Sequence, residues 1–479
     1  MKKILLGLLA IVIALVLFVL IKTVLFTAES IKYEKAELIE VPDAALERLK
    51  KAIQYKTISY EYPGEPDSAE FIGLHNHIAT AYPLVDSLLE KEVIADYSLL
   101  FKWQGSDGSA KPIILMGHMD VVPVDQNTLA QWEAPPFSGE IKDGIIYGRG
   151  TMDDKVTVFS ILEAVEMALQ NGVQPKQTIY LAFGHDEEIG GESGAGAIAE
   201  FLEKKGVKAE YVMDEGGYIG DGVVPGINDP VAIINVAEKG YVSFKLTITT
   251  PGGHSSNPPA DNTIGSLAAA ITRLEENQFP YRMTPVVETQ IATIGPHMPF
   301  VQKMAFANTW LLGTPILKGL NAHTTTAPTI FNAGVKDNVI PTTASVVMNF
   351  RIMPGESVES VRQHVIETVN DERVTIESIS NVNEPSPVSD YESEAYSTIA
   401  KTVKQVIPEA IVSPGLLGGG TDTKHYRKVS ENQYRFLPIR ISPDNMTGFH
   451  GINEHLQVEN YKETVQFFYQ LLKNLQEGE

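Results

Sequence analysis

The chain has 479 residues, of which 43% are hydrophobic and 20% charged, a composition typical of a folded protein long enough for two domains. Its formal net charge of −22 argues against nucleic acid as a partner, because phosphate binding needs clustered lysine and arginine. The absence of cysteine excludes disulfides and thiolate metal sites, so any metal ion must be held by histidine, aspartate and glutamate.

The amino end contains eighteen consecutive residues without a polar side chain, 4–21, preceded by two lysines. As a helix this run measures roughly 27 Å, close to the hydrocarbon core of a bilayer. A cleavable signal peptide has a shorter apolar core and a small-x-small cleavage site, whereas Leu25 and Phe26 occupy positions that need small residues. We therefore predict a transmembrane anchor at 1–28 and a charged stalk at 29–42, with the rest of the chain outside the cytoplasm because the lysines stay inside.

The spacing of apolar residues predicts the next elements along the chain. They are helices at 43–53, 68–82 and 84–89 and a strand at 98–103. An apolar run from Ile113 to Met116 then predicts a buried strand, followed by His118 and Asp120. On an extended backbone these two project to the same side, as a metal ligand and the carboxylate that fixes its tautomer would. A strand followed by a polar loop explains this stretch alone equally well.

Carboxylates also follow a tight glycine turn, where Asp153 and Asp154 begin a helix that is predicted to end at Gly172. Ordinary capping of the helix start accounts for both residues. One of them would also suit a bridge between two metal ions, because a carboxylate has two oxygens and the turn is rigid.

Two further buried strands end in acidic residues. Residues 178–183 lead into His185-Asp-Glu-Glu188, and residues 209–213 lead into Asp214. Like charges this close raise one another's pKa unless a cation neutralises them, and a solvated run of charge seldom follows a buried strand directly. Three strand ends therefore offer His/Asp, Glu/Glu and Asp, which together suffice for a two-metal site.

Three segments at these strand ends resemble the signatures of dinuclear zinc exopeptidases and amidases, a family that includes carboxypeptidase S, aminoacylase and succinyl-diaminopimelate desuccinylase. They are Met116-Gly-His-Met-Asp-Val-Val-Pro123, Tyr147-Gly-Arg-Gly-Thr-Met-Asp-Asp-Lys155 and Phe183-Gly-His-Asp-Glu-Glu-Ile-Gly-Gly191. Residues 324–341 and 349–355 are similar to the subgroup of carboxypeptidase S and the secreted N-fatty-acyl-amino-acid synthase/hydrolase. The resemblance implies a zinc-exopeptidase-like α/β fold, with a mixed, mainly parallel sheet and helices on both faces.

The same resemblance implies a set of metal ligands. Two zinc ions, with cobalt or manganese as substitutes, would be held by His118, Asp153, Glu188, Asp214 and His450. Asp153 would bridge the two ions. His118 and Asp214 would complete the first site. Glu188 and the late His450 would complete the second.

Three catalytic residues are implied besides the ligands. Asp120 would orient His118, and Glu187 would act as the general base, although residue chemistry alone does not distinguish Glu187 from Glu188. His254, in a Gly-Gly-His-Ser-Ser turn, would polarise the scissile carbonyl. The spacing alone is explained by an ordinary turn histidine.

An inserted domain is predicted from the order strand–helix–strand–strand–helix–strand, which is typical of a small open α/β sandwich. It covers residues 238–381 and separates the two parts of the catalytic domain, 43–237 and 382–479. The resemblance implies that this insert is a lid, of the dimerisation type. It also implies Asn338 and Arg351 as substrate contacts, since arginine can grip a carboxylate bidentately.

Two remaining segments are candidates for substrate binding. Residues 298–320 are apolar, which internal packing accounts for, and the alternative is a groove for an acyl chain or an apolar side chain. The glycine-rich turn at 415–426 lacks the Gly-Lys-Ser/Thr ending of a phosphate loop. Backbone amides around Gly420 and Thr421 could instead bind a substrate carboxylate.

We therefore expect a membrane-bound, single-pass protein whose extracytoplasmic catalytic domain is a zinc-dependent hydrolase of amide bonds next to a free carboxylate. The substrate is a small peptide, as for a carboxypeptidase, or an N-acyl amino acid (N-fatty-acyl included), as for an amidase or, in reverse, a synthase. A non-catalytic membrane-tethered binding protein is the remote alternative, and it would be expected to lack a ligand or the base. The sequence leaves open a monomer or a homodimer, and whether His254 serves its own subunit.

Overall fold

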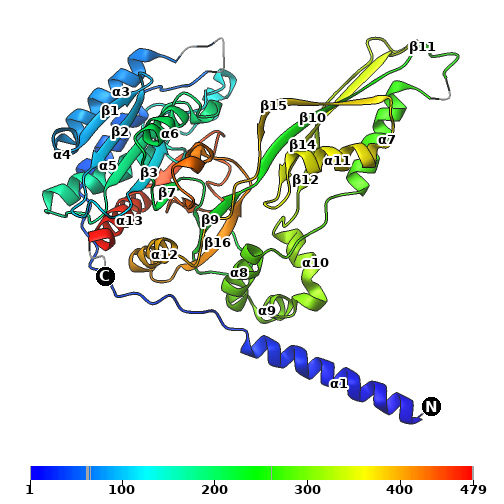
Figure 1. Cartoon of the computed structure of the whole chain (residues 1–479), viewed down its shortest axis with the longest axis horizontal. Coiled ribbons are helices and arrows are strands. Elements are labelled where there is room, and N and C mark those ends of the chain that lie inside the picture. Colours follow the sequence, from blue (N-terminus) through cyan, green and yellow to red (C-terminus); the bar gives the residue numbers. More distant parts are fainter. Residues whose placement is uncertain (1, 61–63, 65, 260, 477–479) are drawn as a thin grey trace.

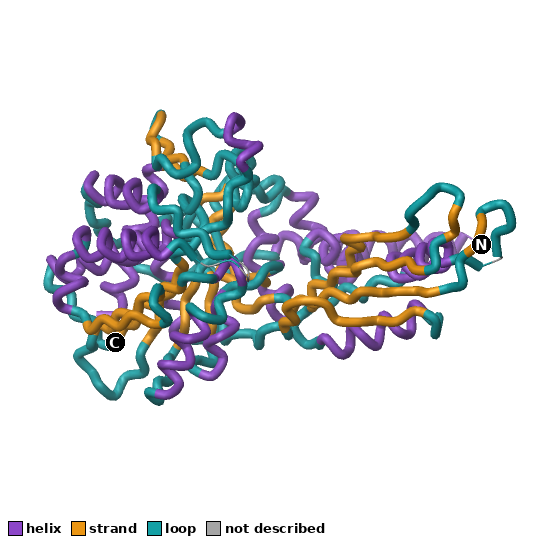
Figure 2. The backbone as a smooth tube through the Cα atoms, turned by 90° about the horizontal axis from the view of Figure 1, so that it is seen from above, coloured by secondary structure: helices purple, strands orange, loops and turns teal. Residues whose placement is uncertain are grey.

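The computed structural model describes residues 2–60, 64, 66–259 and 261–476, so Met1 of the predicted anchor and residues 477–479 of the second catalytic part lie outside the described residues. A large body with a central sheet forms one end of an elongated molecule, and a smaller sheet extends away from it (Figures 1 and 2). Helix α1 (Lys2–Leu25) projects from the body as a separate apolar helix.

The large sheet contains ten strands in the order β1-β2-β6-β3-β7-β17-β9-β8-β18, and β16 pairs with β9 off this path. Strands β6, β3, β7 and β17 are parallel, β1 and β2 add antiparallel strands at one edge, and β9 is antiparallel to β17 and β8. The predicted α/β fold with a mixed sheet is thereby confirmed, and parallel pairing recurs beyond the centre, between β16 and β9 and between β18 and β8. The strands are β1 (Glu90–Ile94), β2 (Ser98–Trp103), β3 (Ile113–His118), β6 (Ile179–Gly184), β7 (Tyr211–Asp214), β8 (Ile219–Gly220), β9 (Val231–Glu238), β16 (Ile411–Leu417), β17 (Gln433–Arg435) and β18 (Arg440–Ile441).

Helices cover both faces of this sheet, which explains why β3 is apolar along its length. Ile113 and Leu115 belong to the core on one face, whereas Ile114 and Met116 belong to the core on the other. The first face is covered by α2 (Asp43–Ile53), α3 (Ser68–Ala81), α4 (Pro83–Leu88), α5 (Lys155–Gln170), α12 (Glu394–Val406) and α13 (Val458–Gln476). The second face is covered by α6 (Ala195–Lys204) and the 3-10 helix η4 (Asp422–Lys428).

The smaller sheet is antiparallel, in the order β12-β14-β10-β15. Its strands are β10 (Gly240–Thr249), β12 (Thr325–Ala333), β14 (Thr343–Ile352) and β15 (Val374–Asn383). Alternate residues of β14 are buried against α7 (Thr263–Glu276) and α11 (Val358–Val369), so one face of the sheet forms a separate core. A two-stranded ribbon, β11 (Gly253–His254) with β13 (Val339–Ile340), forms the tip of the smaller sheet that is farthest from the body (Figure 1).

Three helices between α7 and β12 share no core cluster with the smaller sheet. They are α8 (Pro285–Ile294), α9 (Phe300–Ala307) and α10 (Thr309–Gly319), with the short 3-10 helix η3 (Gly295–His297) between the first two. Helix α8 packs on β16, and α9 packs beside α1. The apolar residues 298–320, predicted as part of the insert, therefore lie against the body and α1.

The segment between α1 and α2 follows the surface of the body. Gln466 donates a hydrogen bond to the carbonyl of Ile39 (2.9 Å), and Gln405 donates one to that of Glu34 (3.4 Å). The side chains of Ile31 and Ile39 pack against the main core. The predicted stalk is thus attached to α12 and α13 along its length.

A third, three-stranded sheet joins distant parts of the chain, because β19 (His455–Gln457) pairs with β5 (Ile145–Tyr147), which pairs with β4 (Glu140–Lys142). This pairing brings the loop before β19 beside the glycine turn that precedes α5. Two of the predicted motifs, 300 positions apart, are neighbours for this reason.

Candidate active site

Four of the five predicted metal ligands meet at the carboxyl edge of the large sheet. One nitrogen or oxygen atom from each of His118, Asp153 and Glu188 lies within 4.8 Å of the others. Nε2 of His118 lies 2.9 Å from Oδ1 of Asp153. Nε2 of His450 lies 3.2 Å from Oδ2 of Asp153 and 3.1 Å from Oε2 of Glu188. The carboxylate of Asp153 therefore stands between the two imidazoles.

The fifth predicted ligand, Asp214, ends β7 next to β3 and is buried. Its Oδ1 accepts the backbone N–H of Glu215 at 3.0 Å, while its Oδ2 has no hydrogen-bond partner among the residues that the structure describes. Oε1 of Glu188 is likewise buried and unpartnered within the described part of the chain. Buried carboxylate oxygens without partners are rare, and a divalent cation would satisfy both, so the residues present fit a metal site.

Asp120 connects the first imidazole to the turn that carries the acidic pair. Nδ1 of His118 lies 3.1 Å from the carbonyl oxygen and 3.3 Å from Oδ1 of Asp120. The same carboxylate accepts the backbone N–H groups of Glu187 and Glu188, each at 3.2 Å. Asp120 thereby holds η2 (Glu187–Ile189) against the end of β3, which is the geometry needed to orient a histidine ligand.

Buried acidic groups dominate the electrostatics of the site. Burial raises the pKa of Glu187 to about 8 and that of Asp214 to about 6. It also raises the pKa of Asp154, Glu215 and Asp422 well above the usual value. Each of these shifts means that the ionised carboxylate lacks a sufficient positive neighbour, which a metal cation would supply.

The pKa of each imidazole is raised as well, which for a histidine favours the charged form. Burial alone would lower the pKa of His118, but hydrogen bonds to Asp120 and Asp153 raise it well above its usual value. Hydrogen bonds to Asp153 and Glu188 raise the pKa of His450 to about 10. A metal ion must displace these protons before the nitrogens can bind it, so we expect metal affinity to fall as the pH falls.

The glycine turn that carries Asp153 is held by Glu454, a residue that the sequence did not single out. Oε1 of Glu454 accepts the backbone N–H groups of Gly150 (2.9 Å), Met152 (2.8 Å) and Asp153 (3.2 Å). Its Oε2 accepts a hydrogen bond from Nη1 of Arg149 at 2.6 Å, and both side chains are buried. Gly150 has a φ of +92°, which glycine adopts without strain. The sequence feature that could have indicated a role for Glu454 is its position four residues after His450 in the same motif.

The glycine-rich turn meets the base of the smaller sheet, because Nη1 of Arg351 donates to the carbonyl of Gly418 at 3.3 Å. The backbone N–H and the hydroxyl of Thr421 both donate to Oε1 of Glu238, each at 2.8 Å. The amide of Thr421 is therefore already used within the protein. A side chain at Gly418, Gly419 or Gly420 would meet open space, so this part of the turn leaves room for a ligand.

His254 and Asn338 lie elsewhere. His254 belongs to β11 at the outer tip of the smaller sheet, where its exposed ring lies 2.8 Å from the hydroxyl of Ser256 (Figure 1). The carbonyl of Asn338 accepts the N–H of Ser255 at 3.2 Å in the same ribbon. Within one chain, these two predicted residues are not brought to the metal ligands.

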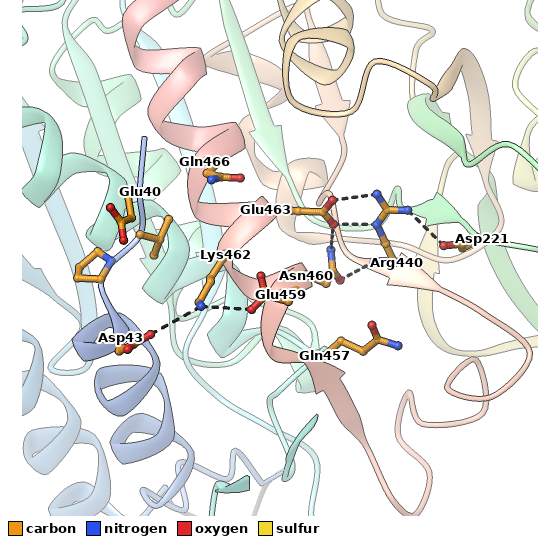
Figure 3. Close-up of a pocket in the computed structure, with 12 residues that line it drawn as sticks. Glu40, Asp43, Asp221, Arg440, Gln457, Glu459, Asn460, Lys462, Glu463 and Gln466 are labelled. Atoms are coloured by element: carbon orange, nitrogen blue, oxygen red, sulfur yellow. Dashed lines mark hydrogen bonds and ion pairs between the residues drawn. The ribbon is translucent and has the colours of Figure 1, made fainter. Parts of the chain in front are cut away.

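A separate pocket of about 590 Å³ lies between the stalk and α13. Most of its charged side chains are paired: Arg440 contacts Glu463 at 2.7 Å and Asp221 at 3.2 Å, and Lys462 lies between Asp43 and Glu459 (Figure 3). None of the predicted site residues lines it, so this pocket is separate from the candidate site, and its Lys462–Asp43 pair joins α13 to the start of α2.

Comparisons with known proteins agree with this geometry. A family model described as peptidase family M20/M25/M40 matches residues 114–474. The probable carboxypeptidase S-like 2 of Dictyostelium discoideum is 39% identical over 96% of this chain and 92% of its own length. The N-fatty-acyl-amino acid synthase/hydrolase PM20D1.1 of Danio rerio is 41% identical over 91% of this chain and 86% of its own length. The crystal structure of an M20 family metallo-carboxypeptidase, Sso-CP2 from Sulfolobus solfataricus, has the same fold, with a TM-score of 0.68, 20% identity, and coverage of 90% of this chain and 99% of that chain.

Proposed function

The chain belongs to peptidase family M20/M25/M40, and on that premise we propose that it is a two-zinc hydrolase of amide bonds that lie next to a free carboxylate. The observation that carries this proposal is the meeting of His118, Asp153 and Glu188 within 4.8 Å. Buried oxygens of Glu188 and Asp214 support it, because they have no hydrogen-bond partner in the described chain and are free to bind a metal ion. A non-catalytic binding protein would be expected to lack a ligand or the base, whereas all of the predicted residues are present.

We assign His118 and Asp214 to one zinc ion. We assign Glu188 and His450 to the other, and Asp153 to both. Imidazole nitrogen and carboxylate oxygen are ordinary zinc ligands, and cobalt or manganese would accept the same set. Asp120 orients His118 through the contacts at Nδ1.

The bound cations would acidify a water molecule and polarise the scissile carbonyl. Glu187 accepts the proton of the water, because its carboxyl is buried beside the ligands and its pKa is raised to about 8. The same carboxyl then donates the proton to the nitrogen of the leaving amine. Asp120 keeps Glu187 in position by accepting its backbone N–H.

The free carboxylate of the substrate would bind between Arg351 and the open glycines of the turn at residues 418–420. Arg351 reaches that turn by its hydrogen bond to Gly418, and its guanidinium lies 4.7 Å over the ring of Tyr241. A guanidinium held in this way can grip a carboxylate with two parallel hydrogen bonds. This contact would select substrates that end in a carboxyl group.

Two substrate classes fit this site. One relative is named as carboxypeptidase S-like and another as a synthase/hydrolase of N-fatty-acyl amino acids, and we propose small peptides first and N-acyl amino acids second. The full chain should be assayed in parallel on dipeptides and on N-acyl amino acids of increasing chain length, together with metal analysis. We expect a chelator to abolish hydrolysis and zinc to restore it. Full turnover by protein shown to contain no metal would overturn the proposal.

We also propose a homodimer in which His254 serves the site of the other subunit, because β11 lies far from the metal ligands of its own chain (Figure 1). A mixture of Glu187→Gln and His254→Ala variants tests this. Mixed dimers would hold one intact site, so re-pairing should restore roughly a quarter of the wild-type activity. If the mixture stays as inactive as its components, His254 acts within its own chain or not at all.

The amino end is proposed as a retained anchor that places the catalytic domain outside the cytoplasm. Among the described residues, α1 is the one helix long and apolar enough to cross a membrane, a test that a signal sequence also passes. Retention is supported by Thr23, which is buried against Asn308 of the body, since a removed signal has no packing role. The intact mass of the membrane-extracted protein checks this, and a mature chain that begins after residue 28 would contradict it.

A further inference from the structure

Helices α9 and α10 form a hairpin beside the last turns of α1. At the bend between them, Nδ2 of Asn308 lies 3.3 Å from the hydroxyl of Thr23 and 3.4 Å from the carbonyl of Val19. The ring of Trp310 meets that of Phe18 edge to face, with centroids 6.3 Å apart. The hairpin is therefore fixed to the part of α1 nearest the body (Figure 1).

The hairpin has large apolar residues both in its packed part and on its surface. Ile316 and Leu317 are buried in a cluster with α8. Five large apolar side chains of the hairpin are between 39% and 69% exposed: Phe300, Val301, Trp310, Leu311 and Leu312. Soluble surfaces rarely group large apolar side chains in this way, and such a group marks an interaction surface.

We propose that the α9–α10 hairpin is a membrane-contacting surface whose exposed apolar side chains enter the same bilayer that α1 spans. The bilayer is the fitting occupant because the exposed side chains are continuous, through Phe18 and Trp310, with the apolar surface of α1. A bilayer around α1 would also contact the α9–α10 hairpin, because the hairpin packs against residues 18–23 of that helix.

The depth of the contact follows from helix geometry. Phe18 lies four residues before Lys22, which is about 6 Å along the helix axis. The ammonium group of Lys22 would lie at the lipid headgroups, so Trp310, which contacts Phe18, would lie about 6 Å below the headgroups. Helices that lie in a membrane interface bury their apolar face by about 5–10 Å, and tryptophan is enriched at this level.

The three tryptophans of the chain provide the test. Trp103 and Trp132 are only 5% and 9% exposed inside the body, whereas Trp310 is 53% exposed. The full chain is reconstituted in phosphatidylcholine vesicles, with and without bromine on the acyl chains. We expect brominated lipid to quench one component of the tryptophan emission, and we expect Trp310→Phe, which keeps the surface apolar, to lose that component.

A pair of variants separates the surface from the anchor. Phe300→Glu combined with Leu311→Glu should abolish the quenching of Trp310 by brominated lipid while α1 keeps the protein in the vesicles. Val335→Glu, at an exposed apolar position beyond β12 in the smaller sheet, is the matched control and should leave the quenching unchanged. Circular dichroism verifies that each variant is folded.

Several results would overturn the proposal. Trp310 that is quenched by aqueous iodide and not by brominated lipid faces water. Trp310 that is protected from both quenchers is covered by protein, such as a second copy of this chain. The inference rests on the anchor proposed above, and the two fail differently. Release of the wild-type chain from the vesicles by alkaline carbonate would contradict both the anchor and the membrane-contacting surface. A chain that stays in the vesicles while Trp310 is not quenched by brominated lipid would contradict the surface alone.

Discussion

Replacing Glu454 tests whether the metal ligands depend on a residue that never contacts the metal. In Glu454→Ala, Arg149 keeps its charge but loses a buried carboxylate that lies 2.6 Å away. The backbone N–H groups of Gly150, Met152 and Asp153 lose their acceptor at the same time. Glu454→Gln keeps one acceptor oxygen for these N–H groups but loses the charge and the oxygen that accepts from Arg149.

The structure sets the size of the effect. Removing one partner of a buried ion pair costs about 3–5 kcal/mol, and a buried N–H left without an acceptor adds about 1–3 kcal/mol. We therefore expect Glu454→Ala to lower the free energy of unfolding by at least about 3 kcal/mol, a large part of the roughly 5–15 kcal/mol of a typical domain. Glu454→Gln should cost about 1.5–3 kcal/mol, the value of a hydrogen bond to a charged group.

Urea unfolding followed by circular dichroism measures the stability, and titration with zinc measures the affinity of the site. We expect the zinc affinity of Glu454→Ala to fall about 10–100-fold, as is typical when a group that supports a ligand is removed. Glu459→Ala is the control, because its contact with Lys462 is exposed and should be worth no more than about 1 kcal/mol. An alanine variant that unfolds at the wild-type urea concentration, or one that is unstable but binds zinc normally, would refute this reasoning.

Three other predictions concern the reaction itself. Glu187→Gln should retain both metal ions on elemental analysis while kcat falls about 10²–10⁴-fold, and a variant that stays active would end the assignment of Glu187 as general base. The base must be ionised, so kcat/KM should fall as the pH drops through the pKa of Glu187. Burial raises that pKa to about 8 and bound cations lower it, so the acid limb of the zinc-loaded enzyme is expected below pH 8, and a limb at or above that value would contradict the scheme. Arg351→Met should raise KM roughly tenfold to a hundredfold for substrates with a free carboxylate, and should change KM little for the corresponding amides. The control is Arg362→Met, in α11 beside the smaller sheet, which should leave KM unchanged for both kinds of substrate. Equal losses for acids and amides would exclude a carboxylate contact at Arg351.

The meeting of His118, Asp153 and Glu188 could be anticipated from the sequence for a simple reason. Each follows a buried strand or a glycine turn, and parallel strands end at the same edge of a sheet. The fold of the body was predictable on the same basis, and α2 begins and ends at the predicted residues. Local patterns carry these features because burial and backbone geometry determine them.

Residues that act across the chain could not be recognised in this way. Glu454 accepts hydrogen bonds from residues more than 300 positions earlier, and Glu238 holds Thr421 from 183 positions away. Nothing in the residues next to either glutamate indicates the distant group that it contacts. Their roles follow from the pairing of β19 with β5 and of β16 with β9.

The apolar segment at 298–320 shows the same limit in another form. Its composition indicated burial or a groove, but the composition of the segment does not identify its neighbours. The structure shows it beside α1 and α8, with large side chains still exposed. Likewise, the turn that contains His254 has an ordinary local conformation, and its distance from the metal ligands follows only from the length of β10 and β14.

The path of the chain between α1 and α2 has a mechanical consequence. A loose tether of that length would let the catalytic body wander about 20–25 Å from the end of α1. Hydrogen bonds from Gln405 and Gln466 instead fasten this segment to the body, so the position of the predicted metal ligands relative to α1 is set by packing. Extra residues inserted there would leave α1 joined to the body only through the α9–α10 hairpin, at Asn308 and Trp310, while every ligand kept its place.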